Sequence, residues 1–271
     1  MRYDICVFGG CSLDMMFYQK DDNTFSENPD KSVSGGKAGN QAVAASRAGA
    51  KVTIITRLGK DSIGDTIFKE LQYNGIFTNN IELVEGLKND CAKIYINAND
   101  KDNTIIRETG AIDSFEPEMI DRYSSVFLNS KIIVGQMKAP KDVCERLINF
   151  CYEHNKPLII TPCRPEKLKI SQEKNKELID KITIITCNKK ECQNIFETDN
   201  IEECVKQYPN KLIVTLGAEG IIYYDGKEIQ HIPSVKIDKL VNATQQELMC
   251  IKLVTPSSKL SKYSKICFFS S

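Results

Sequence analysis

Ser34-Gly35-Gly36-Lys37-Ala38-Gly39-Asn40-Gln41-Ala42 places three glycines and a lysine directly before a run of small residues. Small residues suit a helix that packs tightly on a sheet, so the sequence predicts a helix over 36–49. Backbone N–H groups at a helix N-terminus attract anions, which makes phosphate binding one interpretation. The spacing does not fit the P-loop pattern, because no Ser or Thr follows Lys37. A tight turn from a loop into a helix, without any ligand, is the other interpretation.

On both sides of this stretch the chain alternates predicted strands and helices. Short apolar or β-branched runs predict the strands, and apolar residues at helical spacing predict the helices. The predicted strands are 4–8, 52–56, 132–135, 158–161, 182–186 and 212–216, and the predicted helices after the first are 63–75, 141–154, 172–181, 189–196 and 201–208. Units that alternate in this way build an α/β sandwich around a largely parallel sheet.

Two stretches change to the period of a β-hairpin. Apolar residues alternate with Lys93, Tyr95 and Asn97, and a polar turn at 99–103 follows, which predicts a hairpin over 91–108 with one polar face. A two-stranded hairpin alone is marginal in water. We therefore expect it to pair with strands formed by residues near 15–33, within the chain or across a dimer. A second hairpin, 221–225 with 227–232, turns at Asp225-Gly226.

The composition describes an ordinary globular protein with room for one large domain or two small ones. The 36 Lys and Arg residues balance 36 Asp and Glu residues, which argues against a nucleic-acid partner. No apolar run is long enough for a membrane span, and the first residues do not resemble a signal peptide. The eleven cysteines contain no CxxC pair and are interpreted as reduced thiols of a cytoplasmic protein. The two histidines, His154 and His231, give little basis for metal or Ser-His chemistry.

Five ordered motifs resemble the PfkB, or ribokinase-like, carbohydrate kinases. They are Gly9–Asp14, the stretch 34–65, the hairpin 91–108, Thr186–Glu191 and Thr215–Gly220. The resemblance covers residues 1–244 and implies a ribokinase-like three-layer α/β sandwich with a largely parallel central sheet. It also implies a small β-lid, formed by about 15–33 and 91–108, that covers the sugar and often mediates a homodimer.

The resemblance also implies a site for a small-molecule sugar or nucleoside, for ATP and for Mg²⁺. The acceptor would be bound by Ser12, Asp14, Gly36, Lys37, Asn40 and Lys138, and ATP by Asn188, Thr215, Gly217 and Gly220. Carboxylate and carboxamide groups are natural partners for vicinal hydroxyls. Glu191 would organise Mg²⁺ through water, since this ion keeps much of its hydration shell. The alternative interpretation of Asp14 is an exposed loop acid. That of Glu191 is a first-turn helix acid favoured by the helix dipole, which is the commoner case for such a residue on its own.

The sequence departs from the family at two places. Lys138 stands where ribokinases usually carry a glutamate that contacts the sugar, so ribose itself is not assured as the substrate. After Val241–Thr244 the family's second signature has Gly-Ala-Gly-Asp, whose amides form an anion hole and whose Asp is the general base. Here 245–249 reads Gln-Gln-Glu-Leu-Met, and the tail 245–271 has no glycine and no clear period. Glu247 and Asp238 are interpreted as surface acids, so no catalytic base is assigned.

The sequence therefore predicts an ATP-dependent carbohydrate kinase that transfers the γ-phosphoryl group to a sugar hydroxymethyl, with impaired activity in this chain. The alternative is an inactive sugar-binding pseudoenzyme or a truncated or frameshifted product. The identity of the sugar stays open, because side-chain placement decides hydroxyl geometry and the motif type does not.

Overall fold

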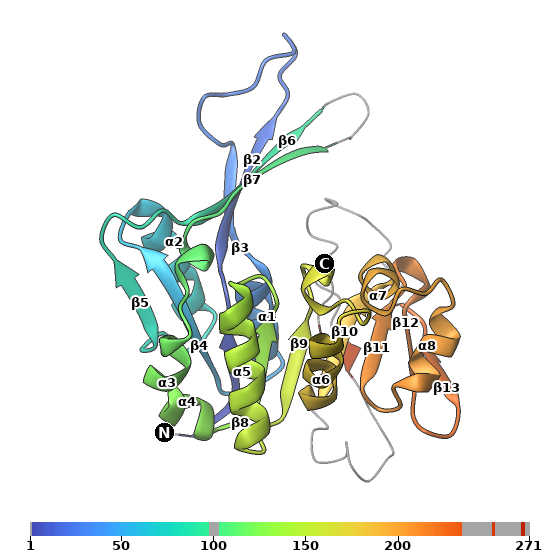
Figure 1. The fold of residues 1–271 in the computed structure, drawn as a ribbon. Coiled ribbons are helices and arrows are strands. Elements are labelled where there is room, and N and C mark those ends of the chain that lie inside the picture. Colours follow the sequence, from blue (N-terminus) through green and yellow to red (C-terminus); the bar gives the residue numbers. More distant parts are fainter. Residues whose placement is uncertain (1, 98–102, 235–250, 253–266, 269–271) are drawn as a thin grey trace.

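A nine-stranded sheet forms the centre of the molecule, in the order β13-β12-β11-β10-β9-β8-β1-β4-β5 (Figure 1). The computed structural model describes residues 2–97, 103–234, 251–252 and 267–268. The strands of the sheet are β1 (Tyr3–Phe8), β4 (Val52–Gly59), β5 (Ile81–Val84), β8 (Ser130–Gln136), β9 (Leu158–Thr161), β10 (Ile184–Asn188), β11 (Leu212–Thr215), β12 (Ile221–Tyr224) and β13 (Ile229–Ile232). Neighbouring strands from β5 to β11 pair in parallel, whereas β12 pairs antiparallel with both β11 and β13.

Described helices lie on both faces of this sheet, as in a three-layer sandwich. Successive residues of β1 point to opposite faces, so Cys6 and Phe8 pack in one core cluster and Ile5 and Val7 in another. The second cluster packs under α1 (Lys37–Arg47) and α2 (Ser62–Tyr73). The first packs under α3 (Glu118–Arg122), α4 (Ser124–Leu128), α5 (Lys141–Glu153), α6 (Glu173–Lys181), α7 (Lys189–Phe196) and α8 (Ile201–Gln207). On one face a third cluster, over β8 to β12, contains strand residues alone: Ile132, Ile159, Ile184, Ile213, Ile221 and Tyr223.

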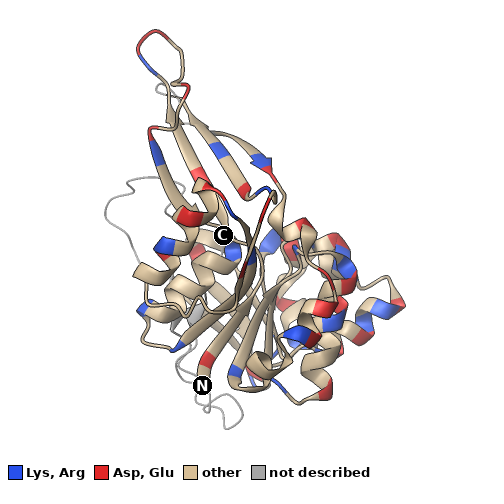
Figure 2. Cartoon of the chain, turned by 90° about the vertical axis from the view of Figure 1, so that its left-hand side faces the viewer, with Lys and Arg blue, Asp and Glu red and all other residues tan. Residues whose placement is uncertain are grey.

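The central strands carry few charges, whereas the helices and the four-stranded sheet that projects from the sandwich carry many (Figure 2). A parallel sheet covered on both faces needs apolar residues on both, which explains the near-continuous apolar runs of its strands. Among the described residues, 3₁₀ turns lie in the connections at η1 (Ala111–Ser114), η2 (Pro165–Leu168) and η3 (Gly217–Glu219). A separate antiparallel pair joins β14 (Ile251–Lys252) and β15 (Cys267–Phe268).

A four-stranded sheet projects from one edge of the sandwich, and we call it the lid (Figure 1). It contains β2 (Ser12–Tyr18), β3 (Lys31–Gly35), β6 (Asp90–Ile96) and β7 (Asn103–Glu108), in the order β3-β2-β6-β7. The predicted hairpin is thus present, and β6 pairs in parallel with β2 along its whole length. The partner strands expected near 15–33 are confirmed, and the pairing occurs within one chain.

The expectation that one face of the hairpin is polar is wrong at Tyr95. Its ring stacks on Phe17, with the ring centroids 4.9 Å apart, and meets the edge of Phe25 at 5.2 Å. Phe17 and Tyr95 are directly opposite in the β2–β6 register, which places aromatic rings against one another. Lys93 does lie on the same face and pairs with Glu108. The face is therefore aromatic near its tip and charged near its base.

Most predicted elements form, with changes at their ends. The strand expected at 182–186 begins at Ile184 and continues to Asn188, and the sequence analysis missed β5, α3 and α4. The nine cysteines whose side chains the structure describes form no disulfide bond with one another. Among the described residues, no helix is long and apolar enough to cross a membrane. The predictions for Asp238, for 241–244 and for Glu247 fall outside the described residues.

Candidate active site

The predicted site residues lie where the parallel strands deliver the chain to its loops. β1 ends at Phe8 before the Gly9-Gly10 turn, β8 ends two residues before Lys138, and β10 ends at Asn188. The carboxyl ends of parallel strands share one edge of the sheet, which is the usual location of ligand sites in open α/β folds. The lid rises from the same edge, since β2 follows directly after the β1 turn.

Asp14 lies within β2 and not in an exposed loop, so that alternative is wrong. Its Oδ1 accepts a hydrogen bond of 3.1 Å from the Ser12 hydroxyl. Burial raises the pKa of the Asp14 carboxyl, while the Ser12 hydrogen bond and the charges of Arg107 and Lys138 lower it. A half-buried carboxylate with one intramolecular donor keeps free lone pairs for hydroxyl groups of a ligand.

The glycine loop brings the N-terminus of α1 against the start of β2. Gly36 is the N-cap of α1, with φ of 80° and no side-chain cap. A β-carbon at Gly36 would lie 2.7 Å from the backbone nitrogen of Ser12, so only glycine fits. Asn40 follows in the first turn, where its N–H donates to the Gly36 carbonyl. The loop thus places the first turn of the helix beside Ser12 and Asp14.

Lys37 connects this loop to the other half of the sheet. Its Nζ lies 3.3 Å from Oε1 of Glu191, which is at the start of α7. Glu191 and Asn188 form a capping box: the Asn188 side chain accepts from the Glu191 N–H at 2.8 Å, and Oε2 of Glu191 accepts from the Asn188 N–H at 3.0 Å. The interpretation of Glu191 as a first-turn helix acid is therefore confirmed. Its Oε1 faces Lys37 across the site.

Thr215 and the two glycines lie next to this helix start. Thr215, at the end of β11, is opposite Asn188 in the parallel register. Gly217 and Gly220 have φ of 63° and 98°, and a β-carbon at Gly220 would lie 2.0 Å from the Ile232 carbonyl oxygen. The glycines therefore fold η3 back closely onto β13. Thr215 thus leads from the strand next to Asn188 directly into η3.

The Lys138 side chain forms an ion pair with the lid. Its Nζ lies 3.2 Å from Oδ2 of Asp90, the first residue of β6, whose side chain is 1% exposed. The other oxygen of Asp90 accepts from the Gly110 N–H at 2.7 Å and the Ile112 N–H at 3.4 Å. One buried carboxylate thus ties both ends of the lid hairpin to the loop after β8. The sequence analysis missed Asp90, because nothing in the local pattern connects it to Lys138.

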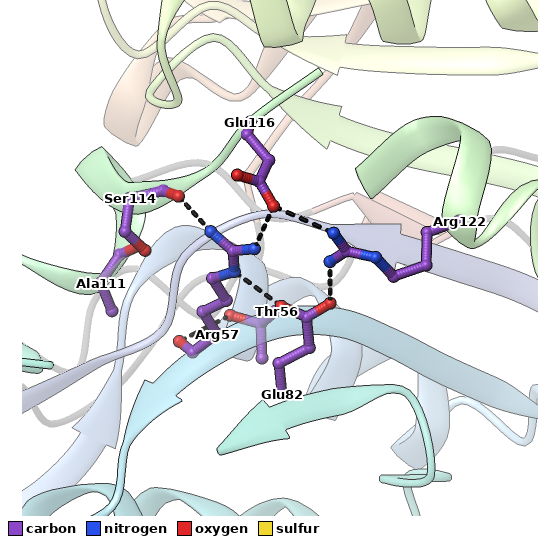
Figure 3. A network of polar contacts seen from close by, with 7 residues as sticks. All are labelled: Thr56, Arg57, Glu82, Ala111, Ser114, Glu116 and Arg122. Carbon is purple, nitrogen blue, oxygen red and sulfur yellow. Dashed lines mark hydrogen bonds and ion pairs between the residues drawn. The ribbon is translucent and has the colours of Figure 1, made fainter. Parts of the chain in front are cut away.

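A second missed group, centred on Arg57, supports the base of the lid (Figure 3). Its guanidinium donates to Glu82 and Glu116, each at 2.6 Å, and to the Ser114 carbonyl in η1. Arg122 bridges the same two carboxylates, at 2.6 Å from Glu82 and 3.0 Å from Glu116. The network joins β4, β5 and α3 to the segment that leaves the lid.

The comparisons with known proteins agree with this geometry. The model of the pfkB family carbohydrate kinases matches residues 2–244, so the chain belongs to that family. Among its relatives, the ribokinase of Bacillus subtilis is 30% identical over 239 residues, which is 87% of this chain and 79% of that protein. The ribokinase of Lactococcus lactis is 32% identical over 213 residues, covering 78% of this chain and 68% of that protein.

Solved structures show the same fold. The Arabidopsis thaliana ribokinase complexed with ribose and ATP matches with a TM-score of 0.75 at 20% identity, covering 90% of this chain and 82% of that one. The ribokinase of Giardia lamblia matches with a TM-score of 0.72 at 19% identity, covering 96% and 85%. The ribokinase-like sandwich and the family assignment are therefore confirmed.

Proposed function

We propose that this chain binds a sugar or nucleoside together with Mg²⁺-ATP, and that its reaction is transfer of the γ-phosphoryl group to a hydroxymethyl of the acceptor. The observation that carries the proposal is the 3.3 Å contact between Lys37 and Glu191. It holds the loop assigned to the acceptor against the helix assigned to the phosphates. Phosphoryl transfer depends mainly on such positioning and on charge stabilisation.

Each half of the site has a distinct role in this proposal. Asp14 accepts hydrogen bonds from acceptor hydroxyls, with Ser12, Gly36 and Asn40 around it. On the other side, Asn188, Thr215, Gly217 and Gly220 bind the nucleotide. The lid excludes water, so that the phosphoryl group goes to the sugar and hydrolysis is avoided.

Mg²⁺ fits the Glu191 site through water. Both oxygens of Glu191 already accept hydrogen bonds, one from the Asn188 N–H and one from Lys37. A carboxylate has about four lone-pair positions, so each oxygen can still accept from a hydrated ion. When bound, Mg²⁺ would neutralise charge on the transferred phosphoryl group. The described residues contain no cluster of three His, Cys, Asp or Glu side chains that could hold a metal directly.

We further propose that catalysis is impaired, because 245–249 lacks the Gly-Ala-Gly-Asp of the family. Loss of an oxyanion-type donor costs ~10²–10³-fold, and loss of a general base a further ~10²–10⁴-fold. The second candidate is a sugar-binding chain without catalytic activity. It is favoured by residues 245–249, because they supply neither the general base nor the anion hole. The abrupt change after Thr244 suggests a shifted reading frame. The coding DNA read in another frame beyond codon 244 should then restore a Gly-Ala-(Gly)-Asp and amphipathic helices.

A coupled ADP-release assay over pentoses, hexoses and nucleosides tests this proposal, together with a thermal-shift screen of the same compounds. We expect stabilisation by an acceptor and turnover at least ~10³-fold below that of the Bacillus subtilis ribokinase. Turnover equal to that enzyme would overturn the impairment and leave the kinase assignment. Absence of both sugar and nucleotide binding would overturn the assignment itself.

The lid is where we propose that two copies of the chain associate. β7 is its edge strand, and it exposes 37% of Ile105 and 49% of Ile106. Light scattering of the wild-type chain and of an Ile106→Glu variant tests this. A dimer that the substitution dissociates supports the proposal, and a monomeric wild type contradicts it.

A further inference from the structure

The inner face of the lid carries a row of polar side chains. Residues directly opposite in neighbouring strands point to the same face of a sheet. Asp14 is opposite Ala92, and Ala92 is opposite Arg107, so Asp14 and Arg107 share one face with only a methyl group between them. Two residues earlier on the same face, Ser12 is opposite Asp90. The row therefore contains an acid at its centre and a cation on the β7 side.

Lys138 adds a second cation at the base of the row, next to the first residue of β6. Its ammonium group donates to buried Asp90, which is beside Ser12. The Lys138 backbone is also held, since its carbonyl accepts from Nζ of Lys167 at 3.3 Å. Lys138 is therefore a fixed side chain within the row, although 29% of it is exposed.

Lys138 needs hydrogen-bond acceptors from a ligand, whereas Asp14 needs hydrogen-bond donors. An ammonium group has three donors and no acceptor, whereas an ionised carboxylate only accepts. Asp90 uses one donor of Lys138, and its own oxygens are occupied by that ammonium and by backbone N–H groups. A ligand that binds along the row must present hydroxyl donors to Asp14 and acceptor oxygens to Lys138.

We propose that the acceptor of this chain is a sugar acid, whose hydroxyls bind Asp14 and whose carboxylate binds Lys138, with Arg107 as the second cation. This inference rests on the proposed function and specifies its substrate class. A carboxylate satisfies a fixed ammonium with a charge-assisted hydrogen bond, which is roughly twice as strong as a neutral one. A neutral sugar offers Lys138 only a hydroxyl oxygen.

Binding of matched neutral and acidic ligands to the full chain without ATP tests the inference. Calorimetry with D-ribose against D-ribonate, and with D-glucose against D-gluconate, should give a Kd about tenfold or more lower for the acid of at least one pair. Lys138→Met should abolish this preference. Lys131→Met is the matched control, because Lys131 pairs with Asp4 near the start of β8, at the end of that strand away from Lys138, and should leave the preference unchanged.

The possible failures are separate. If the wild-type chain binds the neutral sugar as tightly as the acid, or tighter, the inference is wrong and the proposed function stands. If Lys138→Met keeps the full preference for the acid, the assignment of Lys138 is wrong. If neither member of either pair binds, the inference is wrong, and the screen over other sugars and nucleosides with ATP binding decides the proposed function separately. The comparison of neutral and acidic ligands with the wild-type chain decides whether the chain prefers a sugar acid, even if a variant does not fold.

Discussion

A β-carbon at Gly35 would lie 2.5 Å from Oδ2 of Asp14. The two residues are on neighbouring strands of the lid, where Gly35 is opposite Ser12 and Asp14 is opposite Val33. The carboxylate thus leans over the one position of β3 that has no side chain. The glycine of the loop is required here for space, whereas the next residue, Gly36, also needs it for a positive φ.

Gly35→Ala should displace the Asp14 carboxylate and weaken acceptor binding more than tenfold, since a charged hydrogen bond is worth ~1.5–3 kcal/mol. Gly39→Ala is the control, because a β-carbon there meets only the Cys11 side chain, at ordinary distances of 3.4 Å from Sγ and 3.9 Å from Cβ. Calorimetric titration with the best acceptor found in the thermal-shift screen measures the difference. Equal affinity for Gly35→Ala and the wild type would contradict the proposed position of the ligand.

Asp14→Asn should stabilise the free protein at pH 7 and weaken acceptor binding, because the amide oxygen accepts more weakly than the carboxylate. Burial raises the pKa of Asp14 above its usual 3.8, so folding disfavours the ionised form. For an acid with a raised folded pKa, stability falls as pH increases from the unfolded pKa to the folded one, and the loss persists at neutral pH. The amide avoids this loss and can still accept from Ser12. A lower melting temperature for Asp14→Asn at pH 7 would contradict the argument.

Two substitutions at Glu191 should separate its structural role from its role toward Mg²⁺. Glu191→Gln keeps an oxygen that can accept from the Asn188 N–H, so its stability should stay near that of the wild type. Glu191→Ala also removes the acceptor for the Asn188 N–H, which is one half of the capping box, and should cost a further ~1 kcal/mol. Both should weaken Mg²⁺-dependent binding of ATP, measured by titration with and without the ion. If Glu191→Gln binds Mg²⁺-ATP like the wild type, Glu191 serves only to cap α7.

The Arg57 network should make the protein sensitive to acid. Burial raises the pKa of Glu82, but the hydrogen bonds and charges of Arg57 and Arg122 together outweigh it and lower that pKa below its usual 4.5. An acid with a lowered folded pKa stabilises the fold above its unfolded pKa and loses that contribution as pH falls through the folded pKa. Glu82→Gln should therefore cost about 1–3 kcal/mol at pH 7. Urea unfolding of both proteins should show the difference shrinking below pH ~4.5; a constant difference would contradict this origin.

The sequence predicts the elements that depend on local pattern and misses contacts between distant segments. β9 and α7 have the predicted ends, because a β-branched run and an Asn-x-x-Glu cap are local signals. β5 was missed because it is short and no residue in it is fully buried, so its apolar signal is weak. The Asp90–Lys138 pair joins segments far apart in the chain, and no spacing rule reports it. Lys37 was predicted as an acceptor ligand, but its ion pair with Glu191 was not.

The pairing of β2 with β6 has a consequence for how the protein reaches its native state. Between Ser12 and its partner Asp90, the chain must complete α1, β4, α2 and β5. Closing such a long loop costs conformational entropy before the strand pairing contributes any favourable free energy. Non-local strand pairing is therefore slow. During synthesis β2 therefore emerges early and lacks β6 until much later. We expect Asp14 to acquire its surroundings late in folding, so the ability to bind a ligand should recover after the secondary structure of the sandwich does.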